Sequence, residues 1–200
     1  MFDLKTYSSN IQMILGPHDG GQRLMPIAPA EPCRGPGLEI LTAAAPRKLF
    51  SDVRVVSDEY ALCVKSALFL YFSALDASHE IAQSIHSATG SLLHGIMHRQ
   101  EPDFGNSKYW FRRVASHDIY PLLREGALEL LKGQKDSSTA ELLRSEIESS
   151  SRWDPQWFVD QCEAAQGGAS SDFEQRLTEL QRLEWQILFD YCYRKATGAE

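Results

Sequence analysis

The spacing of apolar residues predicts helices over most of the chain beyond residue 57. In residues 58–75, apolar side chains fall on nearly every side of a helix, and Lys65 is the only charge after Glu59. A helix that is apolar all round is typical of the buried centre of a bundle, and Asp58 is its expected N-cap. Near the other end, residues 172–195 place apolar side chains at helical spacing, which predicts a long amphipathic helix.

Shorter helices are expected between these two, most of them bounded by a capping residue or a helix breaker. They cover residues 76–87, 89–100, 119–132, 138–148 and 155–165, and residues 108–114 are expected to form a short helix or a turn. The sequence has no internal repeat and no sustained alternation of the kind that strands show. The predicted fold class is therefore all-α, a single-domain helical bundle over residues 58–195 with about six to eight helices.

Residues 1–50 differ from the rest because they are rich in proline and glycine and read as mostly irregular. Only residues 11–15 and 38–44 are candidates for short helices. An irregular segment of this length is unusual inside a compact domain, so we expect it to wrap around the bundle. Its expected apolar anchors are Ile27, Ile40 and Leu41.

Composition narrows the possible partners. The 200 residues, 43% hydrophobic and 24% charged, suit one globular domain. A net charge of −7 argues against a nucleic-acid or anionic-membrane partner. The longest apolar run, residues 67–75, is shorter than the roughly 20 residues of a membrane span, and the first residues do not resemble a signal peptide. The expectation is a cytoplasmic protein, and the absence of a Cys-x-x-Cys pair excludes a zinc ribbon or thioredoxin-like motif.

The most informative stretch is residues 76–117, which contains five of the six histidines. Two of its predicted helices carry polar stripes with i, i+4, i+7 spacing opposite an apolar face. These stripes are His79, Gln83 and His86 on one helix, and His94, His98 and Glu101 on the next. If the chain folds back near residues 88–90, His79 comes to the level of His98, and His86 to that of His94.

Such an arrangement predicts a divalent metal site. Zinc or iron takes three or four imidazole and carboxylate ligands, and the candidate ligands are His79, His94, His98 and Glu101. Pro102 pushes Glu101 away from regular helical geometry. The alternative interpretation is that these side chains form a structural hydrogen-bond network without a metal.

A second candidate site combines polar and aromatic residues. Arg112 or Arg113 either pairs with a nearby carboxylate or receives the carboxylate or phosphate of a small anionic molecule. Glu184 lies in the middle of the apolar stripe of the last helix, so it needs a partner, for which an arginine or a histidine is expected. The candidate ligand-binding residues are Asn106, Tyr109, Arg112, Arg113 and Glu184.

Residues 94–114 read HGIMHRQEPDFGNSKYWFRRV, and His117 follows them. They resemble an uncharacterised family of bacteria and fungi with the pattern His-x-x-x-His-Arg-Arg-Glu-x-Asp-x-x-Asn-x-Lys-Tyr-Trp-Phe. Gln100 stands where an arginine is common, and Ser78-His79-Glu80 is similar to a second block. The resemblance covers roughly residues 58–130 and implies no established activity.

Two functions follow as hypotheses. The first is a small-molecule or metal-binding site in the helical bundle, with a metal-dependent enzyme as its catalytic form. The second is a non-catalytic domain that binds a protein or ligand and whose His, Arg and Glu cluster is structural. The sequence leaves the reaction class, the substrate and the oligomeric state open.

Overall fold

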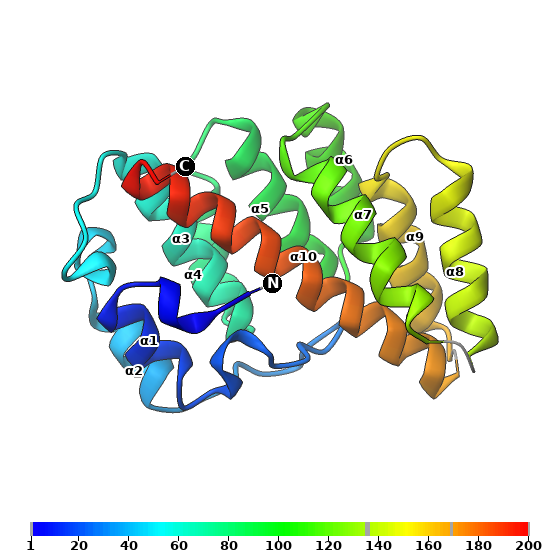
Figure 1. The fold of residues 1–200 in the computed structure, drawn as a ribbon, viewed down its shortest axis with the longest axis horizontal. Helices are drawn as coiled ribbons and strands as arrows, with labels where there is room; N and C mark the ends of the chain where they lie inside the picture. The colour runs from blue at the N-terminus through cyan, green and yellow to red at the C-terminus, as the bar shows by residue number, and fades with distance from the viewer. Residues whose placement is uncertain (1, 135–136, 169, 200) are drawn as a thin grey trace.

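The computed structural model describes residues 2–134, 137–168 and 170–199, and over these residues it is an all-α bundle (Figure 1). This confirms the predicted fold class. The first helices are α1 (Ser9–Leu15), α2 (Pro36–Ala43), α3 (Asp58–Tyr71), α4 (Leu75–Ala82) and α5 (Ala88–Gln100). They are followed by α6 (Phe104–Val114), α7 (Ile119–Lys132), α8 (Ser138–Ser149), α9 (Pro155–Gln166) and α10 (Ser171–Thr197). Three short 3-10 helices, η1 (Leu4–Thr6), η2 (Asp19–Gly21) and η3 (Pro46–Phe50), lie near the N-terminus.

Helix α3 is buried along most of its length, as its apolar sequence predicts. Its N-cap is Ser57, whose hydroxyl accepts a hydrogen bond from the Tyr60 amide, so the expectation that Asp58 is the cap was wrong. The Asp58 carboxylate instead pairs with Arg47 at 2.5 Å. The helix ends at Tyr71, before residue 75, because Ser73 turns the chain with a φ of +55° and lets α4 begin.

Helix α10 crosses the length of the molecule and packs against α3 and α7 (Figure 1). Its apolar face inserts large aromatic residues between these helices. Trp185 is nearly fully buried, and its indole N–H donates to the Ala67 carbonyl of α3 at 2.7 Å. This contact fixes α10 to α3.

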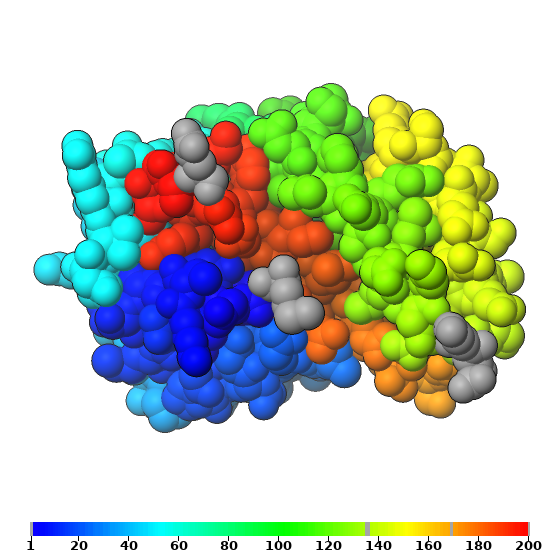
Figure 2. Space-filling view, in the orientation of Figure 1, coloured from blue at the N-terminus to red at the C-terminus, as the bar shows by residue number. Residues whose placement is uncertain are grey.

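The N-terminal segment packs on the bundle rather than extending from it. In Figure 2, the atoms of the first residues lie directly against those of α10. Ile27 and Leu41 are buried and Ile40 is partly buried against the core. Gln181 of α10 donates a hydrogen bond to the Met25 carbonyl at 3.0 Å, so polar contacts also hold this segment.

The corner formed by α4, α5 and α6 positions the candidate site. Helix α4 ends at Ala82, five residues before the predicted end, whereas α6 begins at Phe104 and not at residue 108. The early start has a clear cause, since the Asp103 carboxylate accepts a hydrogen bond from the Asn106 amide and caps the helix. A Cβ on Gly95 would lie 3.1 Å from the Phe111 ring, so this glycine allows α5 and α6 to approach closely.

The later helices agree closely with the sequence patterns. Helix α7 has the predicted bounds, and Asp154 caps α9 through its carboxylate, which accepts from the Gln156 amide at 2.9 Å. Within the described part of the chain, no helix combines the length and the apolar character that crossing a bilayer requires.

Candidate metal centre

Three histidines from two helices converge at the α4–α5 corner. His79 comes from α4, and His94 and His98 come from successive turns of α5. One ring nitrogen of each residue lies within 4.8 Å of the corresponding nitrogen of the other two. Their ring centroids are separated by 4.6 Å for His79 and His94, 5.3 Å for His79 and His98, and 4.9 Å for His94 and His98. The sequence predicted this grouping from the i, i+4 spacing and the helical hairpin.

The cluster is walled by an aromatic side chain of α6. The Trp110 indole stacks on the His94 ring with centroids 3.9 Å apart and planes inclined by 14°. The guanidinium of Arg113 lies 5.3 Å from the centre of the same indole. As a result His94 is 3% exposed and His98 is 6% exposed, while His79 remains partly accessible. The cluster is therefore mostly buried, with His79 as its accessible edge.

Glu101 contacts His98 but lies outside the three-histidine group. Its carboxylate is 3.0 Å from His98 Nδ1, and the Asp103 carboxylate is 4.0 Å from the same atom. A carboxylate partner places the proton of a neutral imidazole on Nδ1 and leaves Nε2 with a free lone pair. Metal-ligating histidines commonly have such a partner. The geometry thus makes Glu101 an orienting residue for His98.

The environment keeps His94 neutral at physiological pH. Burial, followed by the neighbouring His98 and His79, lowers the pKa of His94 to about 4. Burial also lowers the pKa of His98, although the hydrogen bond to Glu101 opposes that effect. A neutral imidazole presents a lone pair, which is the form that binds a metal ion. In addition, His94 Nδ1 is buried and has no hydrogen-bond partner among the described residues.

The distances between the histidine nitrogens are longer than those in a site that already holds a metal ion. Nitrogens bound to one tetrahedral zinc ion at about 2.1 Å lie roughly 3.4 Å apart. The three nitrogens here lie within 4.8 Å, so the side chains would have to move closer for all three to bind one ion. Three protein ligands leave at least one coordination position open.

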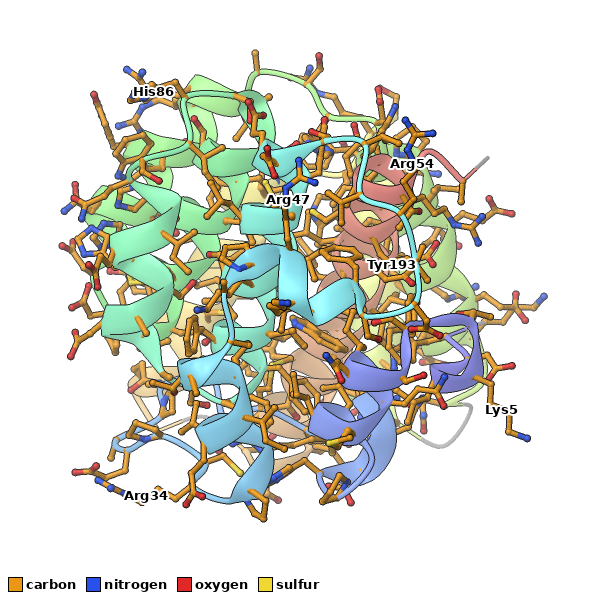
Figure 3. All side chains as sticks on the ribbon, turned by 90° about the vertical axis from the view of Figure 1, so that its left-hand side faces the viewer. Lys5, Arg34, Arg47, Arg54, His86 and Tyr193 are labelled. Atoms are coloured by element: carbon orange, nitrogen blue, oxygen red, sulfur yellow. The ribbon has the colours of Figure 1, made fainter. Side chains whose placement is uncertain are left out.

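His86, the fourth histidine of the predicted stripes, does not join the cluster. Helix α4 stops at Ala82, so His86 falls in the following turn and is exposed. Figure 3 shows it at the edge of the molecule, with its side chain pointing outward. The expectation that His86 would lie beside His94 was wrong because the helix is shorter than its sequence pattern suggests.

Glu184 belongs to a different cluster. Its carboxylate forms a bidentate ion pair with Arg99, and Gln181 accepts from the same guanidinium at 3.4 Å. Arg99 and Glu184 are 0% and 1% exposed at their side chains. The predicted need for a partner was correct, but the expected partners, Arg112, Arg113 or a histidine, were wrong. Arg99 lies next to His98 in the sequence, but it points about 100° away around α5 and contacts α9 and α10.

The other candidate ligand-binding residues do not meet at one point. Asn106 donates to the Asp103 carboxylate at 2.9 Å and strengthens the cap of α6. Tyr109 is 46% exposed and lies below the Arg113 guanidinium. Arg112 faces a separate hollow next to α7. The predicted single anion pocket is therefore divided between two faces of α6.

Both ring nitrogens of His117 form hydrogen bonds within the fold, which gives this residue a structural role. Its Nδ1 accepts from the Ile119 amide at 3.3 Å, and its Nε2 lies 3.0 Å from the Thr89 hydroxyl. Because Nδ1 is the acceptor, Nε2 carries the proton and donates to Thr89. Burial lowers the pKa of His117, which keeps it neutral in this role. The residue connects the start of α5 to the start of α7.

The side chains and their geometry carry the functional argument for this chain. No family model, curated protein or solved structure matches it.

Proposed function

We propose that the protein binds a divalent transition-metal ion through His79, His94 and His98 and receives a small molecule at the open coordination position. The observation that carries this proposal is the convergence of three imidazole nitrogens within 4.8 Å. Two of the rings are buried, and burying polar groups without partners is costly. A shared metal ion would supply the missing partner.

Zinc suits this ligand set better than iron. Non-haem iron sites of the oxygenase type combine two histidines with a carboxylate. Here the convergent group contains three histidines, and the nearest carboxylate, Glu101, is bonded to His98 Nδ1. Three histidines and an open position are found in catalytic zinc sites, whereas structural zinc sites are closed by four protein ligands.

The chemistry that such a centre supports is hydrolysis or hydration. A zinc ion with three imidazole ligands lowers the pKa of a bound water to about 7 and polarises a carbonyl or phosphoryl oxygen. Glu101 would raise the basicity of His98 through their hydrogen bond. His79 lies on the accessible side of the cluster, where a substrate would enter.

A purely structural role is the competing proposal, and it also has a specific observation behind it. The His98–Glu101 hydrogen bond and the stacking of Trp110 on His94 would hold α5 to α6 without a metal. In this case the domain would be non-catalytic, and the histidines would contribute to stability alone.

Metal titration separates the two proposals. Protein produced without a histidine tag is stripped with a chelator and titrated with Co²⁺, whose visible absorption reports tetrahedral binding. We expect one ion per chain for the wild type and for His86→Ala, because His86 is exposed and outside the cluster. His98→Ala should abolish the absorption. Equal Co²⁺ binding by wild type and His98→Ala would contradict the metal proposal.

A further inference from the structure

A second hollow lies on the other side of α6 from the histidine cluster. It has a volume of about 410 Å³ and is bounded by the end of α6, the start of α7 and the loop that precedes α9. Trp110 and Arg112 are two residues apart on α6, which places them about 200° apart around the helix. Trp110 stacks on His94, whereas Arg112 lines the hollow, so the two sites are distinct.

The wall of this hollow is positively charged. Arg112, Arg124 and Arg152 all line it. Within residues 2–134, 137–168 and 170–199, neither Arg112 nor Arg152 forms an ion pair. Arg124 is partly engaged, since it donates to the Ser150 carbonyl at 3.0 Å. Three guanidinium groups around one hollow are unusual in a chain with a net charge of −7.

The acidic group nearby offsets only part of this charge. Asp154 is the one carboxylate of the described lining against three arginines, and one of its oxygens accepts from the Gln156 amide as the cap of α9. The amino-terminal ends of α7 and α9 also border the hollow. Helix N-termini carry a partial positive charge that favours an anion. The electrostatic character of the hollow is therefore cationic.

Two buried donors in the lining have no partner. The Tyr120 hydroxyl and the Trp153 indole N–H are buried and form no hydrogen bond with any described residue. Tyr120 is 7% exposed and Trp153 is 1% exposed. Burial raises the pKa of Tyr120, so its hydroxyl stays protonated. Both donor atoms are closed off from solvent, so Tyr120 and Trp153 offer the hollow their ring surfaces rather than hydrogen bonds.

The rest of the lining combines apolar and polar side chains. Phe111, Tyr120 and Trp153 contribute aromatic rings, Ala115 and two prolines add apolar surface, and the remaining polar residues are Ser116, His117, Ser151 and Gln156. A volume of about 410 Å³ falls within the range of roughly 300–1,000 Å³ for small-molecule sites. Such sites combine apolar walls with a few polar groups that orient the ligand. The hollow thus has a place for an apolar body next to a place for an anion.

We propose that this hollow binds a small phosphate monoester with an aromatic or apolar body. The guanidinium groups of Arg112 and Arg152 hold the phosphate, because guanidinium matches phosphate oxygens in a bidentate manner. The Phe111 ring packs against the body. This site goes beyond the metal centre and does not depend on it.

Isothermal titration calorimetry at low ionic strength tests the proposal with phenyl phosphate as the probe. Inorganic phosphate and phenol are titrated separately and represent its two halves. We expect phenyl phosphate to bind more tightly than either of them. Arg152→Gln and Arg112→Gln should each weaken its binding by about tenfold or more, the usual loss when one charge-assisted hydrogen bond is removed. Both residues are exposed, so the variants should fold.

Arg54→Gln is the matched control, because it removes one exposed arginine at the other end of the molecule (Figures 1 and 3). We expect it to bind phenyl phosphate like the wild type. His98→Ala should also bind normally, which separates this site from the metal centre. The proposal is overturned if phenyl phosphate shows no saturable binding at millimolar concentration. It is also overturned if Arg54→Gln weakens binding as much as Arg152→Gln, or if inorganic phosphate binds as tightly as phenyl phosphate.

Discussion

Two buried polar clusters share helix α5, and they differ in how their groups are paired. On one face, Arg99 forms its ion pair with Glu184 and contacts Gln181. On the other face, His94 and His98 meet His79, and His94 Nδ1 has no partner in the described chain. Each cluster leaves one buried nitrogen without a partner among the described residues, Arg99 Nε in the first and His94 Nδ1 in the second. The first cluster pairs a cation with a carboxylate, whereas the second brings three imidazoles together, and this grouping of possible metal ligands is what points to a ligand.

The Arg99 cluster joins four parts of the chain. The Arg99 guanidinium lies 4.4 Å from the centre of the Phe158 ring of α9, and Glu184 and Gln181 belong to α10. Gln181 also donates to the Met25 and Pro26 carbonyls of the N-terminal segment. A buried ion pair with these additional hydrogen bonds fixes the relative positions of the helices, even when its net energy is small.

The largest expected effect follows from breaking that pair. Glu184→Ala leaves the Arg99 charge buried and unpaired, which typically costs about 3–5 kcal/mol. Urea unfolding measures the loss. Glu125→Ala, at an exposed position of α7, should change the free energy of unfolding by less than about 0.5 kcal/mol. The double variant Arg99→Met, Glu184→Leu should recover most of the loss. A loss below about 1 kcal/mol in Glu184→Ala would contradict this account.

Metal should stabilise the protein through the histidine cluster alone. At a free zinc concentration of about 100 times Kd, mass action raises the free energy of unfolding by about 2.7 kcal/mol. We expect this increase for the wild type and for His86→Ala, and none for His98→Ala. Thermal unfolding with and without zinc provides the measurement. If zinc raises the Tm of His98→Ala as much as that of the wild type, the stabilising ion binds elsewhere.

Acidification should weaken the apo protein through the same histidines. The pKa of His94 is lowered to about 4 in the folded protein, against about 6.5 when unfolded. Between these values the unfolded chain binds the proton and the folded chain does not. The contribution of neutral His94 to the free energy of unfolding is therefore complete above pH 6.5 and decreases as the pH falls towards 4. We expect the free energy of unfolding to fall by an amount on the order of 2 kcal/mol.

The contribution of His94 is obtained from the difference between wild type and His94→Gln. Urea unfolding of both proteins at pH 6.5 and 4.5 removes the effects of groups common to the two. The variant should show a shallower dependence on pH. Identical slopes would mean that His94 remains accessible to protons in the folded state, contrary to its burial beneath Trp110.

The smallest expected effect concerns Glu101. Glu101→Gln removes the carboxylate that orients His98, and the loss of such a partner typically weakens metal binding by about 10- to 100-fold. The side chain is 49% exposed, so stability should change little. Competition with a coloured chelator measures the affinity. Glu80→Gln, an exposed neighbour of His79, is the control and should bind like the wild type. Equal affinities for all three proteins would exclude an orienting role for Glu101.

The sequence predicted the helices well because most of them carry clear caps or breakers. It also predicted the meeting of His79, His94 and His98, since their spacing along two short helices leaves few other arrangements. It did not predict that α4 would end at Ala82. The Ser84 hydroxyl bonds to the Ile81 carbonyl there, and this local competition with the helix is not visible in the pattern of apolar residues.

The partner of Glu184 and the second hollow could not be read from the sequence for a different reason. Arg99 and Glu184 are 85 residues apart, and only the tertiary fold brings them together. The hollow combines residues of α6, α7 and the loop before α9, and although Arg112 was a candidate for binding an anion, no sequence pattern places Arg124 and Arg152 beside it. Long-range packing is the information that a single sequence lacks.

The close approach at Gly95 gives Phe111 an unusual position. On one side its ring touches Gly95, the neighbour of His94, and on the other it lines the cationic hollow. One benzene ring therefore sets the spacing of α5 and α6 and also forms part of the wall of the hollow. A side chain added at residue 95 would push this ring, so a change inside the helix pair would alter the shape of the hollow on its far side.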